Sequence, residues 1–133
     1  MVGAAELLKL PLLRLEGWGT WAKWFEAAGV SAPAALRGPV LNQASMLIDA
    51  AIDGQGVALA RTVLAISDLL NGRLVMPVDV TLDLPKTYWI VSPKIGSNAP
   101  MIAKFRDWLL AEAVEDARRL KALQAQRSRN RKA

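Results

Sequence analysis

The sequence predicts an α/β fold with a mainly parallel sheet and flanking helices, and two observations support this. Short apolar runs that suit buried strands alternate with segments whose apolar residues recur at helical spacing. The alternation is clearest in residues 40–61, where a strand end, an amphipathic helix and a second apolar run follow in tight succession. Parallel strands connected through helices are covered on both faces, so helices are expected on both faces of this sheet.

The first predicted elements are a strand at Leu12–Glu16 and a helix that carries most of the aromatic side chains. The residues at helical spacing are Trp18, Trp21, Trp24, Phe25 and Ala28. Gly29 follows them and is expected to end the helix. We expect this stripe to pack on the sheet or on another subunit. The alternative is a stacking platform for nucleic acid or a sugar, but Lys23 is the only basic residue interleaved with it.

After a predicted loop over residues 31–39, the next unit begins at Val40. Asn42 and Ser45 are candidate helix caps, because short side-chain oxygens can accept hydrogen bonds from the free N–H groups of a helix start. The apolar face of the helix is formed by Leu47, Ile48, Ala51 and Ile52. Gly54 and Gly56 are expected to end the helix, and Val57–Ala60 suits a short buried strand.

The remaining elements are predicted from similar signals. Thr62 can cap a helix that runs to Leu70 and ends before Gly72, and strands are expected at Leu74–Val78 and Thr87–Val91, separated by a break at Pro85. On the helix that starts at Thr62, one face is expected to hold Val63, Ile66 and Leu70. Asn98 and Pro100 open the final helix, which is expected to fray beyond Leu120. Its predicted inward residues are Ile102, Phe105, Trp108 and Leu109.

Composition excludes several kinds of chemistry. The chain of 133 residues has no cysteine and no histidine, so it can hold no disulfide and no serine–histidine or cysteine–histidine nucleophile system. No apolar run is long enough to span a membrane. The N-terminus is apolar, but Glu6 and Lys9 interrupt it and no cleavage-site pattern follows, so a cytoplasmic location is expected.

The net charge of +5 comes entirely from the C-terminal residues. Residues 1–114 contain ten basic and ten acidic side chains, whereas residues 115–133 contain seven basic and two acidic ones. The basic composition is therefore no evidence for a DNA-binding face on the globular part. The tail could contact phosphates, but a solvated tail is the favoured interpretation.

Two further spacings have ordinary explanations. Asp49 and Asp53 lie one helical turn apart, but without histidine or additional carboxylates they indicate a solvated helix face more than a metal site. Gly54 and Gly56 do not form a dinucleotide-binding fingerprint, because they follow a helix instead of opening one.

Five segments, in order, resemble one family. They are LLRLEGWGTWAKWFEAAGV (12–30), Arg37-Gly38-Pro39, AAIDGQGVALAR (50–61), LLNGRLVMPVD (69–79), and YWIVSP (88–93) with FRDWLLAEA (105–113). Together they resemble the effector-binding domain of LysR-type transcriptional regulators, in the subgroup that includes the glycine-cleavage activator. The likeness covers roughly residues 4–115. It implies Rossmann-like subdomains in a periplasmic-binding-protein-like type II fold that is incomplete here.

The resemblance implies a division of the chain. Residues 1–85 would be most of the second effector-binding subdomain, residues 86–115 would return to the first subdomain, and residues 116–133 would be a basic tail. The winged helix-turn-helix, the linker helix and the first half of the effector domain are expected to lie outside this sequence. The return strand would then lack neighbours, which predicts an exposed apolar surface and self-association as a dimer or higher oligomer.

The resemblance also implies a site for a small polar or anionic metabolite. Asn42, Gln43 and Ser45 would hold the ligand at a helix N-terminus, although capping alone would also explain them. Arg61 could pair with an acidic effector or with Asp49, Asp53 or Asp68. Tyr88 and Ile90 would lie at the hinge. No cofactor or metal is expected.

The function predicted is effector sensing that regulates transcription in the intact protein, without catalysis. DNA would be bound only through the missing N-terminal domain, and no membrane partner is expected. Two alternatives from other classes are a fragment of a periplasmic-type solute-binding protein and, less favoured because histidine and cysteine are absent, a small α/β enzyme.

Overall fold

The computed structural model describes residues 3–17, 20–83, 88–96 and 99–130, and the chain divides into two compact units, residues 1–83 and 84–133. Trp18, Pro85, Thr87 and Asn98, which figure in the expected elements, lie outside the described residues. The assignment of the sequence to two subdomains and a tail stays a prediction.

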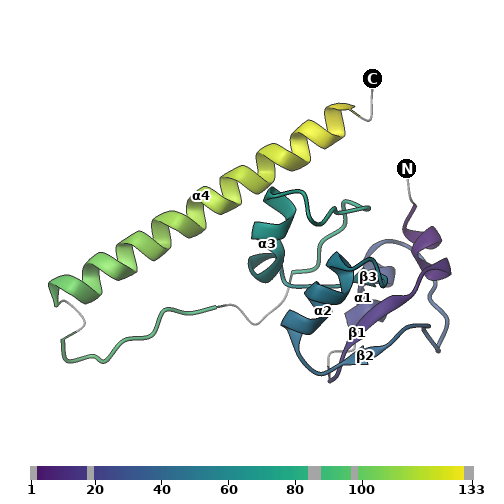
Figure 1. Ribbon diagram of the computed structural model, residues 1–133, viewed down its shortest axis with the longest axis horizontal. Coiled ribbons are helices and arrows are strands. Elements are labelled where there is room, and N and C mark those ends of the chain that lie inside the picture. Colours follow the sequence, from purple (N-terminus) through teal and green to yellow (C-terminus); the bar gives the residue numbers. More distant parts are fainter. Residues whose placement is uncertain (1–2, 18–19, 84–87, 97–98, 131–133) are drawn as a thin grey trace. The chain divides into compact units, whose positions relative to one another are not determined.

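The first unit contains a three-stranded parallel sheet. Strand β1 (Leu12–Leu15) lies between β2 (Val40–Leu41) and β3 (Val57–Ala58), and it runs parallel to both (Figure 1). Leu15 is level with Leu41, and Leu13 is level with Ala58. The prediction of an α/β fold with a parallel sheet is confirmed, although β3 is shorter than the predicted run Val57–Ala60.

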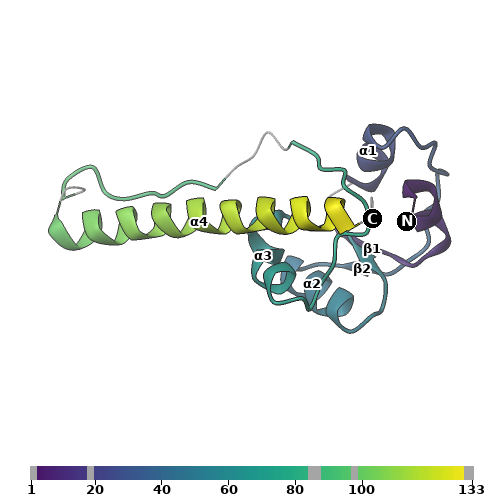
Figure 2. The ribbon, with the colours of Figure 1, turned by 90° about the horizontal axis from the view of Figure 1, so that it is seen from above.

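Helices cover both faces of this sheet. Helix α1 (Thr20–Ala27) lies on one face, and α2 (Ala44–Ile52) lies on the other together with α3 (Thr62–Leu70) (Figure 2). Successive residues of β1 point to opposite faces, so Leu12 packs in the cluster of α1 and Leu13 in that of α2. A 3₁₀ helix, η1 (Ala4–Lys9), precedes the sheet and was not predicted.

The aromatic stripe of α1 forms the centre of the core. Trp21, Trp24 and Phe25 are at most 5% exposed, and their ring centroids lie 5.3–5.6 Å apart. Trp21 Nε1 donates a hydrogen bond to the Leu13 carbonyl at 2.9 Å, and Trp24 Nε1 donates to the Val80 carbonyl at 2.9 Å. The interpretation of this stripe as a packed helix face is confirmed for these residues.

Arg37-Gly38-Pro39 runs beside β1. The Leu12 N–H donates to the Arg37 carbonyl at 2.9 Å, and the Arg14 N–H donates to the Pro39 carbonyl at 3.0 Å. The Arg14 guanidinium also donates to the Gly38 carbonyl at 2.8 Å. This segment therefore extends the pairing of β2 with the central strand.

The predicted strand at Leu74–Val78 is wrong, because this segment has no regular secondary structure. The N–H groups of Arg73 and Leu74 donate to the Asp68 carbonyl at the end of α3 instead of to a strand. Farther along, Val78 and Val80 pack against the aromatic core. Side-chain burial without sheet pairing explains the apolar pattern, and Pro77 has no N–H to donate.

The predicted strand at Thr87–Val91 is also wrong over its described part. Residues 88–91 form neither helix nor strand, and their large side chains are exposed. A strand needs a partner that completes its hydrogen bonds, and the sheet of the described chain consists of β1, β2 and β3 alone.

The predicted side-chain caps are wrong. The N-cap of α2 is Gln43 and the N-cap of α3 is Arg61, and neither makes a side-chain capping hydrogen bond. Asn42 and Ser45 flank the cap position of α2, and Thr62 is the first residue of α3.

The buried face of α3 also differs from the prediction. Ala65, Asp68 and Leu69 are buried, Ile66 and Leu70 are partly buried, and Val63 is 55% exposed. Asp68 forms an ion pair with Arg73 just beyond the helix end. The buried face thus combines Leu69 with the small Ala65 and a paired carboxylate, and hydrophobicity alone does not reveal the last two.

The second unit contains helix α4 (Pro100–Asn130), which includes residues predicted to fray. The four side chains predicted to face inward, Ile102, Phe105, Trp108 and Leu109, are between 36% and 59% exposed. That prediction is wrong for this chain. Although α4 has the length of a membrane span, neither it nor any other described helix is apolar enough to cross a bilayer.

Candidate functional site

The candidate site lies at the edge of the sheet where the three parallel strands end. Asn42 and Gln43 directly follow β2, and Ser45 is in the first turn of α2. All three residues are exposed. The side chain of Gln43, the N-cap residue, makes no hydrogen bond to the first N–H groups of α2.

Arg61 lies at the same edge. It follows β3 by three residues and occupies the N-cap position of α3, where its carbonyl accepts a hydrogen bond from the Leu64 N–H at 3.0 Å. Parallel strands have their carboxyl ends on one side, so Arg61 and the start of α2 lie on the same side of the sheet. Arg61 is partly buried.

The helix N-termini at this edge favour an anion. Helix α1 also follows a strand carboxyl end, so three helices start on this side of the sheet. None of the three has an acidic residue in its first turn. Each helix N-terminus carries roughly half a positive charge. Acidic side chains of the helices' own first turns therefore do not offset this charge.

Glu16 was missed by the sequence reasoning and lies at this edge. It directly follows β1, is exposed, and donates its N–H to the Leu41 carbonyl at 2.8 Å. Its position after the central strand was visible in the sequence, where it was taken as the strand's last residue. A carboxylate here would favour a ligand that carries an amino group beside its acidic group.

Tyr88 and Ile90 belong to the second unit. They are 57% and 44% exposed and lie in an irregular segment. Their predicted place at a hinge beside the ligand stays a prediction.

The acidic residues considered as partners or ligands are dispersed. Asp68 pairs with Arg73, and both Asp49 and Asp53 are exposed. Within the described ranges, no three acidic, cysteine or histidine side chains gather in a way that could hold a metal ion.

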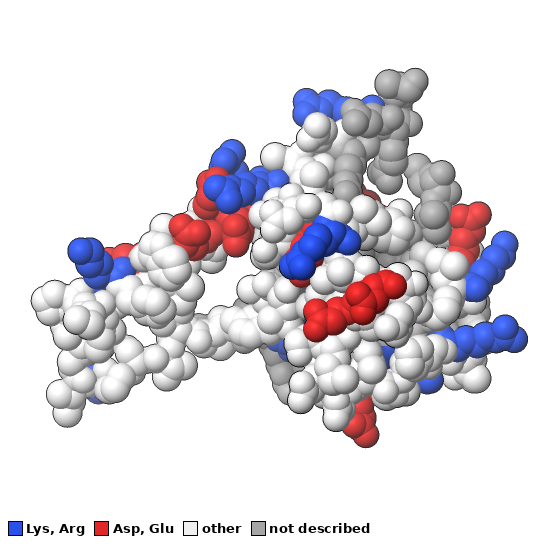
Figure 3. All heavy atoms as spheres, in the orientation of Figure 1, with Lys and Arg blue, Asp and Glu red and all other residues white. Residues whose placement is uncertain are grey.

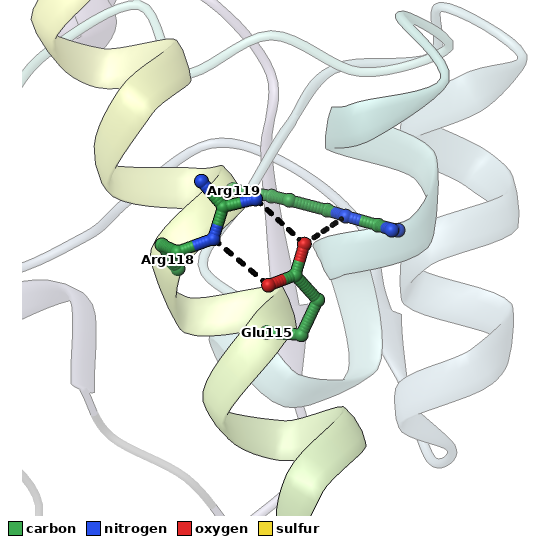
Figure 4. Close-up of polar contacts among 3 residues, drawn as sticks. All are labelled: Glu115, Arg118 and Arg119. Carbon is green, nitrogen blue, oxygen red and sulfur yellow. Dashed lines mark hydrogen bonds and ion pairs between the residues drawn. The ribbon is translucent and has the colours of Figure 1, made fainter.

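Among the described residues, a large pKa shift is found for Glu115 on α4, which is not part of the candidate site. Glu115 accepts hydrogen bonds from Arg118 at 2.8 Å and from Arg119 at 2.9 Å (Figure 4). The two hydrogen bonds from Arg118, then the one from Arg119, lower the pKa of Glu115 to about 2. The same contact raises the pKa of Arg118. One carboxylate thus binds two cations within a single helix.

Comparison with protein families shows to which family this chain belongs. The family model of the LysR substrate binding domain matches residues 2–114. The chain belongs to this family. The resemblance inferred from the five segments is confirmed.

Named relatives of the chain are bacterial transcriptional regulators. The chain is 33% identical over 111 residues to the glycine cleavage system transcriptional activator of Escherichia coli K12, which covers 84% of this chain and 36% of the relative. It is 37% identical over 92 residues to the HTH-type transcriptional activator AmpR of Providencia stuartii, covering 69% of this chain and 31% of the relative. The chain therefore spans about a third of the length of these regulators.

Solved structures show the same likeness. The effector domain of AmpR from Pseudomonas aeruginosa matches with a TM-score of 0.61 at 29% identity, covering 90% of this chain and 59% of that domain. The AmpR effector binding domain of Citrobacter freundii matches with a TM-score of 0.61 at 26% identity, covering 84% of this chain and 56% of that chain. The fold of the LysR effector-binding domain is thus present, in part, in these 133 residues.

Proposed function

We propose that this chain is the effector-sensing part of a LysR-type transcriptional regulator and that a small polar or anionic metabolite binds at the carboxyl edge of its sheet. The observation that carries the proposal is the meeting of helix N-termini and Arg61 at that edge, without acidic residues in the first turns. Backbone N–H groups and a guanidinium can together bind a carboxylate or phosphate through charge-assisted hydrogen bonds.

The regulatory part of the proposal rests on family membership. In the intact regulator, the metabolite would favour one arrangement of subunits over another, and the DNA-binding domain would respond. Such a shift requires that the ligand bind the two arrangements with different affinity. The relatives named above are regulators, which supports this function over a solute-binding protein or an enzyme. A cytoplasmic location and self-association are parts of the same proposal.

The proposed ligand contacts are Asn42, Gln43, Ser45 and Arg61 in the first unit, with Tyr88 and Ile90 at the hinge. Affinity should be weak, because a ligand on one wall of a cleft remains largely hydrated. We expect dissociation constants in the millimolar range, where binding free energies are about −4 kcal/mol.

Isothermal titration with small carboxylates, phosphates and amino acids tests the proposal. A charge-assisted hydrogen bond contributes about 1.5–3 kcal/mol, so Arg61→Gln should weaken the best ligand by roughly tenfold or more. Arg37→Gln is the matched control, because Arg37 is exposed and precedes β2 at the opposite edge of the sheet. Equal effects of the two variants, or tighter binding of neutral and cationic compounds than of anions, would contradict the proposed site.

A further inference from the structure

The C-terminal half of α4 carries a basic face, formed by Arg118, Lys121 and Arg129. Lys121 and Arg129 lie three and eleven residues after Arg118, about one and three helical turns, so the three side chains share one side of the helix. All three residues are exposed, and so is Ala125 between them. Leu120, on the other side of the helix, is buried.

Few negative charges accompany this basic face. Glu115 accepts two hydrogen bonds from Arg118, both at 2.8 Å, and so offsets part of the charge where the face begins. Residues 117–133 contain no acidic residue, so none lies within one helical turn of Lys121 or Arg129. Figure 3 shows red spheres among the blue ones over the middle of α4, and blue spheres without red ones towards its C-terminal end.

The helical structure of this segment changes the expectation of a frayed, solvated tail. Helix α4 continues to Asn130, so the basic side chains project from a regular scaffold. From Arg118 to Arg129 the helix axis rises by about 16 Å. Duplex DNA carries one negative charge per about 1.7 Å of its axis, so roughly ten phosphates occur along such a length. A polyanion of this kind can contact several of the cations at once, which a single small anion cannot.

We propose that the basic face binds the phosphate backbone of duplex DNA without regard to its sequence. The face lies beyond residues 2–114, which the family model of the substrate binding domain matches. The proposal therefore concerns a part of the chain outside that domain, and it is independent of the proposed effector site. It departs from the expectation that DNA is bound only through an N-terminal domain.

Other polyanionic surfaces fit this segment less well. A helix that binds a membrane surface presents large apolar side chains opposite its basic ones. In residues 115–130 the large apolar side chains are Leu120 and Leu123, which are buried and partly buried. Single-stranded nucleic acids are bound by stacking on aromatic side chains, and residues 109–133 contain none. Contact with the phosphates of a duplex requires only the charges that the helix provides.

Fluorescence anisotropy with labelled duplexes of about 20 base pairs tests the proposal on the 133-residue protein. We expect a dissociation constant of about 10–100 μM at about 50 mM salt, equal for two duplexes of unrelated sequence. Lys121→Gln combined with Arg129→Gln should weaken binding at least tenfold. The slope of log K against log salt concentration should become less steep by about 2, because each neutralised phosphate contributes about 0.9.

The matched control is Lys104→Gln combined with Arg106→Gln. It removes the same charge from α4 outside the basic face, where Arg106 pairs with Asp107. Circular dichroism verifies that both double variants keep their helices. Equal effects of the two double variants, preference for one duplex sequence, or a dissociation constant above about 1 mM would overturn the proposal. So would tighter binding to poly-glutamate or to vesicles of phosphatidylglycerol and phosphatidylcholine than to DNA. None of these results bears on ligand binding at the sheet edge.

Discussion

Gly54 and Gly56 follow α2 for different reasons. Gly54 has φ +74°, the left-handed conformation that ends many helices, and a Cβ there would meet nothing within 4 Å. Gly56 is not left-handed, but a Cβ on it would lie 2.4 Å from the Pro11 carbonyl oxygen. The Val57 N–H donates to that same carbonyl at 2.9 Å. Gly56 therefore permits the close approach of the chain that starts the pairing of β3 with β1.

This difference predicts unequal costs of two matched substitutions. Gly56→Ala should lower the free energy of unfolding by about 2–4 kcal/mol, because backbone must move at the start of β3. Gly54→Ala should cost about 1–2 kcal/mol, the penalty of a left-handed alanine in open space. Urea unfolding monitored by tryptophan fluorescence measures both, since Trp21 and Trp24 are buried in this unit. A larger loss for Gly54→Ala would contradict this account of Gly56.

Residue-level predictions from the sequence succeeded where a single pattern determines the role. The spacing of Trp21, Trp24 and Phe25 identified core residues, because three aromatics at helical period leave few other arrangements. Capping could not be predicted in the same way. Asn42 and Thr62 have suitable side chains, but the caps are Gln43 and Arg61. The sequence does not fix the start of a helix to within one residue, and a shift of one residue changes which side chain can reach the first N–H groups.

At the scale of elements, α4 depends on local charge pairing in its second half. Glu115 lies one turn before Arg118 and Arg119, and spacings of three and four residues bring side chains together on a helix. The high charge of this segment predicts fraying only if the pairing of these charges is left out. Helical structure extends to Asn130.

The pKa of Glu115 predicts how this helix responds to acid. The folded-state pKa is lowered from 4.5 to about 2, so the stabilisation is fully present above about pH 4.5 and is lost as the pH falls toward 2. Helicity of residues 115–126 should therefore decrease between these pH values, as followed by Cα chemical shifts or circular dichroism at 222 nm.

Glu115→Gln is the control for that titration, because it keeps the side-chain shape and removes the ionisation. The variant should have lower helicity than the wild type at pH 7, and the difference should disappear near pH 2. If both proteins lose helicity in parallel across this range, other carboxylates are responsible and the role given to Glu115 is wrong.

The strands show why some elements could be predicted and others could not. Leu12–Leu15 is a strand because both faces of its apolar run are covered, which the flanking helices in the sequence already implied. Leu74–Val78 has an equally apolar run, but Val78 and its neighbour Val80 reach the core without pairing to the sheet. Burial and hydrogen-bond pairing are separate requirements, and the sequence pattern reports only burial.

At the scale of the whole molecule, the alternation of strands and helices was enough to predict a parallel α/β sheet, and the five segments identified the family. The exposed face of residues 101–109 was predicted as an inward face, because the pattern of an amphipathic helix indicates that it packs but not against which chain.

The candidate site shows the same division. The placement of Asn42, Ser45 and Arg61 at one sheet edge follows from strand polarity alone, and the sequence was sufficient for it. Glu16 at that edge was not among the predicted residues. The place of Tyr88 and Ile90 beside the ligand stays a prediction, because both belong to the second unit.

The most direct test of the central claim is a ¹⁵N-correlated NMR titration of the 133-residue protein with the tightest small anion from the calorimetric screen. The account predicts that the largest shifts occur at the backbone amides of Ala44, Ser45 and Met46, followed by those of Arg61 and Thr62, and that Arg61→Gln reduces all of them together. Shifts that concentrate at Arg37, on the opposite edge of the sheet, or in residues 100–130 would contradict the claim that this sheet edge is the effector site.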